Sequence, residues 1–314
     1  MKNFIKKMAV TFTLVMIVLS SALVFAKITH TLLVVDNYNQ SRFPDAFRMT
    51  SDALPPESQS QTDGLDHVHA VGSQQFSKAG LTAVLKKIPS KSVVIIDLRR
   101  ESHGFLNDSA ISWYGPQNAA NQSKSPKKIR LSETRLLNKL NKSRFQWVHQ
   151  ILEKTNDGFV ARTSKEFMRV NSVMSEQQFA SDLHLKYKRF YVEDFHAPEE
   201  VDVVRFVNFA KHLPEDTWLY FHCRAGRGRT TTFMAMYDMM KNAKHVSFND
   251  IVDRQYALGG TDLRELPDED NFKYGYASHR LSFIKNFYEY VKENNDDYST
   301  TWLQWKKKHP VKSS

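Results

Sequence analysis

The stretch from His222 to Phe233, HCRAGRGRTTTF, constrains the fold of this chain more than any other feature. It follows the apolar run Trp218 to His222, which predicts a buried strand, and it leads into the largely apolar run Thr230 to Lys241, which predicts a helix. A strand that passes through a glycine-containing loop into a helix is a unit of α/β folds. The sequence therefore predicts that this loop lies between a buried strand and a helix.

The same loop holds the only cysteine of the chain, Cys223, and three arginines. A strand–loop–helix junction brings backbone N–H groups and the positive end of a helix dipole to one point, and such a junction binds phosphate. The guanidinium fork of Arg229 suits two phosphate oxygens, and positive surroundings favour the thiolate form of a cysteine. The rest of the predicted phosphate-binding loop comprises Arg224, Ala225, Gly226, Arg227 and Gly228.

This pattern predicts nucleophilic catalysis, in which Cys223 attacks phosphorus and water then hydrolyses the phosphocysteine. The alternative is a buried cysteine that acts as a small hydrophobic residue. Thr230 follows the loop, and its hydroxyl can stabilise the sulfur as a leaving group. The chemistry also needs an acid for the departing alkoxide. Asp194, on a loop before a predicted helix, is the favoured candidate, and Glu193 and His196 are rivals on the same loop.

The amino terminus has the form of a secretory signal peptide. Three lysines precede an uncharged, mostly apolar run from Met8 to Ala26, which ends in a small residue. The alternative is a retained membrane anchor, because the run is near the length that spans a bilayer. We expect cleavage after Ala26, a mature chain of residues 27–314 without a further membrane segment, and export to the periplasm or the medium.

The formal net charge of +10 suits nucleic acid, anionic lipid or a polyanionic small molecule. No zinc pattern or stacking-aromatic pattern accompanies the charge, which argues against nucleic acid. The histidine pair His67 and His69 lacks further ligands at metal spacing, so we expect no metal, and no cofactor motif is present.

Hydrophobic patterns outline further elements. Residues 29–35 and 93–98 are expected to form strands, and residues 175–185, 198–213 and 279–292 are expected to form helices. Residues 37–75 and 107–130 are rich in polar residues, proline and glycine, and are expected to be mainly loops.

With these residues in view, the chain resembles a known family. The stretch FHCRAGRGRTT resembles the signature loop of the protein-tyrosine-phosphatase superfamily, and the wider chain resembles the bacterial tyrosine-phosphatase-like phytases. The matching stretches are FRMTSDALP (47–55), VGSQQFS (71–77), DLRRESHGFLN (97–107), SWYG (112–115), LPEDTWLYFHCRAGRGRTTTFMAMYDMMKN (213–242), DRQYALGG (253–260) and WLQWKKKHP (302–310). They extend over nearly the whole mature chain.

The resemblance implies an α/β domain, in which a mostly parallel sheet is flanked by helices, with a small β-rich subdomain from about 28–50 and 97–160. It also implies stepwise, metal-independent release of phosphate from myo-inositol hexakisphosphate. By the same resemblance Cys223 is the nucleophile, Arg229 binds phosphate and Asp194 is the general acid. The further positions that it suggests for substrate or water are Arg48, Lys273, Arg280, Gln255, His196 and His222.

The chain departs from the family pattern in two places. The family usually has histidine directly after the general acid, whereas this chain has Phe195, with His196 one place later. Arg224 and Arg227 stand where related phytases often have an acidic and an apolar residue, and they resemble the basic loop of phosphoinositide 3-phosphatases. We interpret these two arginines as functional, because charges around a phosphate site raise the local concentration of polyanions.

The main hypothesis is thus an exported, monomeric inositol-polyphosphate phosphatase. A phosphoinositide lipid phosphatase is the alternative, although no membrane-binding helix supports it, and a protein tyrosine phosphatase is third. A catalytically inert binding module is a non-enzymatic alternative, and the complete set of Cys223, Arg229 and Thr230 argues against it.

Overall fold

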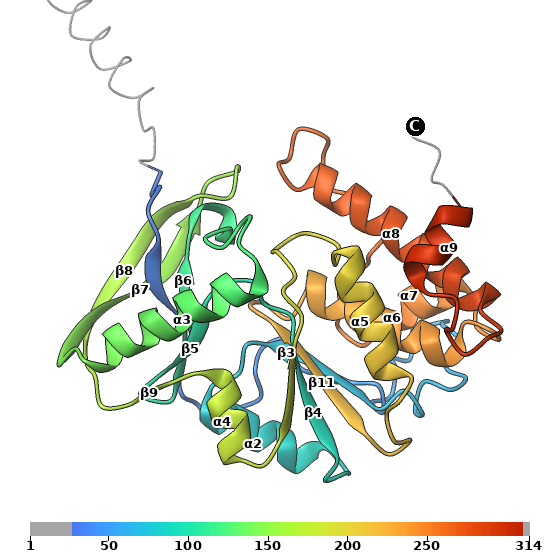
Figure 1. Cartoon of the computed structure of the whole chain (residues 1–314), viewed down its shortest axis with the longest axis horizontal. Coiled ribbons are helices and arrows are strands. Elements are labelled where there is room, and N and C mark those ends of the chain that lie inside the picture. Colours follow the sequence, from blue (N-terminus) through green and yellow to red (C-terminus); the bar gives the residue numbers. More distant parts are fainter. Residues whose placement is uncertain (1–26, 310–314) are drawn as a thin grey trace, which may run out of the picture.

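The structure is a computed structural model that describes residues 27–309, so the predicted signal peptide lies outside the described residues. Two sheets lie side by side, each with helices of its own (Figure 1). The sheet that carries the catalytic loop has five strands in the order β10-β4-β11-β3-β2. Their bounds are Arg48–Met49 (β2), Ala70–Gln74 (β3), Val93–Asp97 (β4), Lys186–Arg189 (β10) and Trp218–Cys223 (β11).

Four of these strands are parallel, and only β2 is antiparallel to its neighbour β3. The strand β11 pairs with β4 on one side and with β3 on the other, so the loop that follows it emerges at the middle of the sheet. The expected α/β fold with a mostly parallel sheet is confirmed.

Both faces of this sheet are covered by helices, as Figure 1 shows. One face packs on α5 (Glu200–Ala210), α6 (Gly228–Asn242), α7 (Phe248–Ala257), α8 (Tyr274–Glu293) and α9 (Trp302–Lys308). The opposite face packs on α2 (Lys78–Lys87) and α4 (Glu176–Asp182). Successive side chains of β4 alternate between the two cores, with Val94 and Ile96 in the first and Val93 and Ile95 in the second. A fully buried strand of this kind accounts for the continuous apolar run in the sequence.

The second sheet has six strands in the order β8-β7-β1-β6-β5-β9. Their bounds are Leu32–Asn37 (β1), His103–Leu106 (β5), Ser109–Tyr114 (β6), Phe145–Lys154 (β7), Val160–Arg169 (β8) and Val173–Met174 (β9), with the helix α3 at Pro126–Asn141 and the short 3-10 helix η1 at Pro116–Asn118. We propose that this sheet and α3 form the small β-rich subdomain.

The sequence-based outline was wrong for part of residues 107–130. That segment contains β6 and the start of α3, where a loop was expected. The side chain of Ser125 caps α3, and Pro126 occupies its first turn, where a missing N–H costs nothing. Pro126, which contributed to the loop prediction, therefore belongs to the first turn of a helix.

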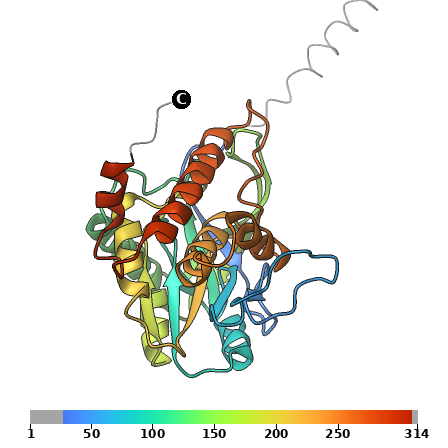
Figure 2. The same ribbon diagram turned by 90° about the vertical axis from the view of Figure 1, so that its right-hand side faces the viewer.

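None of the helices in the described part of the chain is long and apolar enough to cross a membrane. Figure 2 shows the helices α8 and α9 above the five-stranded sheet, with the loop between β2 and β3 projecting at one side of the molecule. This loop reaches the neighbourhood of the catalytic loop, because its residues Glu57 and Ser58 line a groove with Arg227.

Candidate active site

The loop between β11 and α6 is held in a tight curve by contacts on its inner side. Gly226 has a φ of +71°, and a Cβ atom at this position would lie 2.3 Å from the backbone nitrogen of Gln74. Only glycine meets both conditions. Beneath the loop, the buried guanidinium of Arg48 donates to the carbonyl oxygen of Gly226 at 3.0 Å and to Thr231 Oγ1 at 3.0 Å. The local backbone is therefore fixed by β2 and β3.

The curve leaves the backbone donors of the loop available. Within residues 27–309, the N–H groups of residues 224–227 donate to no acceptor. They precede the first turn of α6, where the helix dipole is positive. Free N–H groups at a helix amino terminus form a binding site for an anion, so this geometry suits a phosphate group.

Cys223 is 3% exposed and ends β11 at the base of this loop. Its negative charge acts on three arginines, Arg48, Arg229 and Arg280. Burial lowers the pKa of Arg48 to about 10, and the Cys223 charge opposes that change. Guanidinium groups from β2, α6 and α8 therefore surround the sulfur.

Arg229 lies in the first turn of α6 and is fully buried. Its guanidinium donates to Glu101 Oε2 at 2.8 Å and to the carbonyl oxygen of Val192 at 3.1 Å. Burial acts to raise the pKa of Glu101, but the charges of Arg229 and Arg99 hold it well below its usual range. The Nε atom of Arg229 has no partner within residues 27–309. Glu101 therefore orients the guanidinium and leaves one donor for a ligand.

A chain of buried ion pairs continues from Glu101 to the other side of the loop. Arg99 Nε lies 2.8 Å from Glu101, and Arg99 Nη2 lies 2.9 Å from Asp36. Asp36 also accepts from Arg224 Nε at 2.7 Å. The two arginines that break the family pattern therefore differ, because Arg224 is neutralised by Asp36 whereas Arg227 is exposed and has no carboxylate partner within residues 27–309.

Asp194 is brought to the same place by the loop between β10 and α5. Its Oδ1 atom lies 3.1 Å from Arg229 Nη2, and its Oδ2 atom accepts from Asn118 Nδ2 at 2.9 Å. The next residue, Phe195, has a φ of +68°, which is strained for a bulky side chain and re-aims the loop. Of the three rival acids on the loop, only Asp194 contacts Arg229. Glu193 Oε1 is buried without a partner in the described chain, and the His196 ring packs at a tilt of 43° against Tyr276.

Thr230 is fully buried, and its Oγ1 atom has no hydrogen-bond partner within residues 27–309. The hydrogen bond to sulfur that the sequence suggested is therefore not formed in this structure. His222 points to the opposite face of the sheet, where its Nε2 atom lies 2.7 Å from Glu176 Oε1. It supports the base of the loop from behind.

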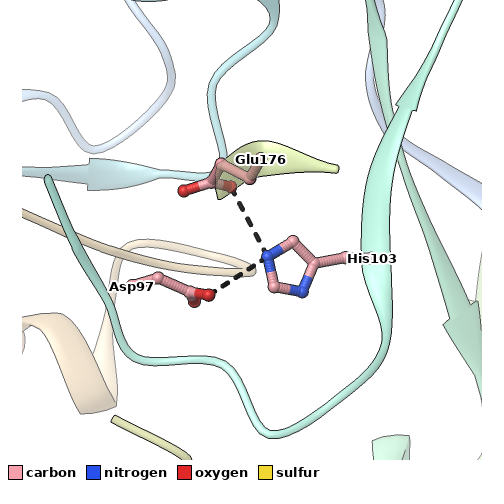
Figure 3. A group of neighbouring side chains, drawn as sticks. All are labelled: Asp97, His103 and Glu176. Atoms are coloured by element: carbon pink, nitrogen blue, oxygen red, sulfur yellow. Dashed lines mark ion pairs between the residues drawn. The ribbon is translucent and has the colours of Figure 1, made fainter. Parts of the chain in front are cut away.

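Behind His222 lies a buried group of acids and a histidine, Asp97, His103 and Glu176, shown in Figure 3. His103 Nε2 is 3.3 Å from Asp97 Oδ2 and 3.5 Å from Glu176 Oε2. Burial acts to lower the pKa of His103, but the Asp97 carboxylate raises it to about 9. The side chain of Arg189 also pairs with Asp97, at 3.0 Å. Protonated His103 and the guanidinium of Arg189 therefore supply the positive charges beside these carboxylates. The group is an ion-pair network.

Arg48 and Gln255, which the resemblance suggested for substrate or water, form hydrogen bonds within the protein. The guanidinium of Arg48 lies beneath the loop and donates to the carbonyl oxygen of Gly226, so it holds the loop in place. Gln255 is buried between α7 and α6, and its Nε2 atom donates to Asp238 Oδ2 at 2.9 Å. Asp238 lies ten residues into α6, about 15 Å of helix rise from the loop. The Gln255 Oε1 atom has no partner within residues 27–309, and the role of positioning water that was suggested for this residue stays a prediction.

Lys273 and Arg280 do lie at the site. The ammonium of Lys273 is 5.3 Å from the centre of the Phe195 ring, and Arg280 Nη1 donates to the Phe195 carbonyl oxygen at 3.2 Å. Together with Phe195 they line a cavity of about 220 Å³. The Arg280 guanidinium also borders Gly228 of the loop, where a Cβ atom would lie 3.0 Å from it.

Three residues of this site were not predicted from the sequence. Glu101 and Asn118 orient Arg229 and Asp194, and Lys154, at the end of β7, lies 4.8 Å from the centre of the Tyr114 ring. Desolvation by neighbouring groups and the charge of Arg224 lower the pKa of Lys154 to about 8, although its side chain remains in contact with solvent. The available signal for Glu101 was its place directly after two arginines, in DLRRES, at the end of a predicted strand. Nothing in the local sequence marks Lys154, because the fold of the second sheet brings it here.

The sequence profile of the PTP-like phytase family, described as "Inositol hexakisphosphate", matches residues 96–241. A PTP-like myo-inositol phosphatase from Mitsuokella multacida, solved with myo-inositol-(1,3,4,5)-tetrakisphosphate, is similar at 34% identity and a TM-score of 0.84, over 92% of this chain and 50% of that one. A PTP-like phytase from Bdellovibrio bacteriovorus is similar at 31% identity and a TM-score of 0.70, over 89% of this chain and 95% of that one.

A relative of another kind is the effector protein hopD2 from Pseudomonas syringae pv. tomato, which is 26% identical over 267 residues. That match covers 83% of this chain and 56% of the relative. The chain therefore spans about half the length of the Mitsuokella and Pseudomonas relatives, and nearly the full length of the Bdellovibrio phytase.

Proposed function

This chain belongs to the PTP-like phytase family, and on that premise we propose that it is a metal-independent phosphatase that removes phosphates stepwise from inositol polyphosphates. The observation that carries the proposal is the meeting of Cys223, the free N–H groups of residues 224–227, buried Arg229 and Asp194 at one point. These groups supply a nucleophile, a phosphate cradle and an acid.

In the proposed reaction the loop N–H groups and Arg229 bind the oxygens of one phosphate, and the Cys223 thiolate attacks phosphorus in line with the ester oxygen. The P–O bond to the inositol breaks, and Asp194 gives its proton to the departing oxygen. Water then cleaves the S–P bond, and Asp194 takes up a proton from that water. Asp194 lies 3.1 Å from Arg229, so the phosphate oxygens bound by this guanidinium and the acid are close to each other.

The substrate class follows from the charge around the cleft. Arg48, Lys154, Arg227, Lys273 and Arg280 have no carboxylate partner within residues 27–309. Lys273 and Arg280 border the loop on one side, and Lys154 lies on the other side beside Tyr114. A ring that carries several phosphates can contact such groups simultaneously, whereas a single phosphotyrosine cannot. We therefore propose inositol hexakisphosphate as the main substrate, with Lys273, Arg280 and Lys154 binding its outer phosphates.

A phosphoinositide is the second candidate, because exposed Arg227 borders a groove of about 750 Å³ beside the loop. The structure supports a phosphoinositide substrate less than the two extra arginines of the loop did in the sequence, because Arg224 is neutralised by Asp36. We also propose that the predicted leader at residues 1–26 directs export of the protein.

The test is phosphate release by the purified protein, in EDTA, from inositol hexakisphosphate, a soluble phosphoinositide and a phosphotyrosine peptide. We expect the highest kcat/KM on inositol hexakisphosphate, and none for Cys223→Ser. Preference for the phosphoinositide would transfer the assignment to the second candidate. Release that persists in Cys223→Ser would contradict the cysteine mechanism.

A further inference from the structure

The outer surface of the second sheet carries an aromatic face, which we define as Phe145, Trp147 and Phe167. These side chains are 43%, 52% and 54% exposed, although each is large and apolar. They lie on β7 and β8, at the outer end of the sheet on the left of Figure 1. Isolated exposed hydrophobic residues are ordinary, but three adjacent aromatic rings mark an interaction surface.

Strand register explains why the three rings meet. The antiparallel pairs are Phe145 with Arg169, Trp147 with Phe167 and His149 with Lys165. Opposite residues of such a pair point to the same side of the sheet, so these six side chains share one face. No acidic residue occupies this face between Phe145 and His149, because Glu166 pairs with Val148 on the other side.

The rim of the aromatic face is cationic. Arg144 lies beside Phe145, with its guanidinium carbon 5.7 Å from the ring centre, and Lys165 and Arg169 flank Phe167 in the sequence. All three are exposed, and none has a carboxylate partner in the part of the chain that the structure describes. Apolar rings surrounded by positive charge complement a surface that has an apolar interior and an anionic boundary.

We propose that the aromatic face binds the surface of an anionic lipid bilayer. Aromatic side chains favour the boundary between head groups and acyl chains, and basic residues around them are attracted to anionic lipids. The protein would lie on the membrane without crossing it, as interfacial segments do.

The ring geometry separates this partner from nucleic acid. Phe145 and Phe167 already stack on each other, with centres 5.2 Å apart and planes 14° apart, and Trp147 packs against Phe167 at 4.9 Å. Nucleobases need free ring faces for stacking. Entry into a lipid boundary needs only exposed apolar area, which these rings offer.

Charge also argues against a second copy of the chain as the partner. A two-fold contact through this face would place Arg144, Lys165 and Arg169 of one copy close to the same residues of the other. Like charges at such a distance destabilise the contact.

The face is separate from the active site. Phe145 is nine residues before Lys154 along β7, which corresponds to about 30 Å of extended strand. Binding at this face therefore holds the protein at a bilayer and leaves the cleft free, so the inference does not depend on the substrate.

The experiment is co-sedimentation of the protein with phosphatidylcholine vesicles, with and without 30% phosphatidylserine (about a third anionic lipid, where juxtamembrane basic residues are attracted). We expect binding only with phosphatidylserine, and weaker binding as salt rises. The double variant W147A/F167A should lower the affinity about tenfold or more. Charge reversal in K165E/R169E should lower it by about the same factor.

The matched control is Phe43→Ala, because Phe43 is as exposed as Phe145, at 43%, and stacks on Phe47 in another part of the chain. All variants should keep the same rate on p-nitrophenyl phosphate, which reports an intact fold. Equal loss of vesicle binding in Phe43→Ala, or no binding to phosphatidylserine at low salt, would overturn the proposal. Loss of self-association or of oligonucleotide binding in W147A/F167A, with vesicle binding unchanged, would overturn it as well.

Discussion

Two groups of cationic side chains meet at the catalytic loop, and they differ in whether a carboxylate accompanies them. Arg229 and Arg224 are paired, the first with Glu101 and Asp194 and the second with buried Asp36. Lys273, Arg280 and Lys154 are unpaired within residues 27–309, although their charges reach the same cleft.

The difference assigns separate tasks to the two groups. A paired, buried guanidinium is held in one orientation, which suits a group that must bind the reacting phosphate in a fixed geometry. An unpaired cation keeps its attraction for anions in the cleft, and several of them together favour a substrate with several negative charges. The paired group therefore serves the chemistry, and the unpaired group serves the choice of substrate.

Cys223→Ser should separate the two tasks most completely. We expect phosphate release to fall by about 10⁴-fold or more, because the nucleophile is lost. The unpaired cations remain, so inositol hexakisphosphate should still bind. Steady-state rates and calorimetric titration measure the two effects, and loss of binding together with activity would show that the groups are not separable.

Glu101→Gln should disrupt the paired group. It leaves the buried guanidiniums of Arg229 and Arg99 without a shared carboxylate, so stability should fall by about 3 kcal/mol or more. The kcat should also fall, because Arg229 loses its orientation. Chemical denaturation is the measurement, with Glu199→Gln as control, since Glu199 pairs with Arg100 at the surface and should change stability by less than about 1 kcal/mol. Equal stability of the two variants would contradict the role given to Glu101.

Asp194→Asn tests the acid that the paired group holds in place. We expect the rate on inositol hexakisphosphate to fall by about 10²- to 10⁴-fold, because the alkoxide leaves without a proton. The rate on p-nitrophenyl phosphate should fall much less, since nitrophenolate leaves unaided. The comparison is made in parallel with Glu193→Gln, which should show no such dependence on the leaving group.

Lys273→Ala acts on the unpaired group. The KM for inositol hexakisphosphate should rise about tenfold, which corresponds to the loss of one charge contact, while kcat changes little. The KM for p-nitrophenyl phosphate should stay the same, because that substrate does not reach Lys273. Lys91→Ala, at an exposed position outside the site, is the control. A fall in kcat on both substrates would move Lys273 into the catalytic group.

The smallest effect concerns the pH dependence of binding. The pKa of Lys154 is lowered to about 8 by desolvation from neighbouring groups and by Arg224, so its positive charge is present below pH 8 and is lost as the pH rises through that value. The KM for inositol hexakisphosphate should therefore increase by a few-fold between pH 7 and pH 9. Lys154→Arg keeps its charge over this range and should flatten the profile. An unchanged profile in this variant would exclude Lys154 as the source.

The sequence was sufficient for the chemical core of the site. Cys223, Arg229 and the glycines of the loop are contiguous, and their spacing between a strand and a helix already specifies a phosphate cradle. The buried strands β4 and β11 could be predicted for a similar reason, because each is a continuous apolar run, whereas their parallel arrangement was implied only by the family resemblance.

The rest of the site depends on long-range packing. Glu101 and Arg229 are 128 positions apart in the chain, and Asn118 reaches Asp194 across 76 positions, so no local pattern connects them. The β7–β8 hairpin was not predicted, because its exposed strands mix aromatic and charged residues without a continuous apolar run. Gln255 shows the opposite case, in which a residue at a suggestive sequence position contacts Asp238 in the core.

The most direct test of the two-group account is the affinity of the Cys223→Ser protein for inositol hexakisphosphate, measured by calorimetry as the salt concentration is raised. The account predicts tight binding at low salt that weakens steeply toward the affinity for phenyl phosphate, because unpaired cations bind the outer phosphates. An affinity that equals that for phenyl phosphate at low salt, or that does not respond to salt, would contradict it.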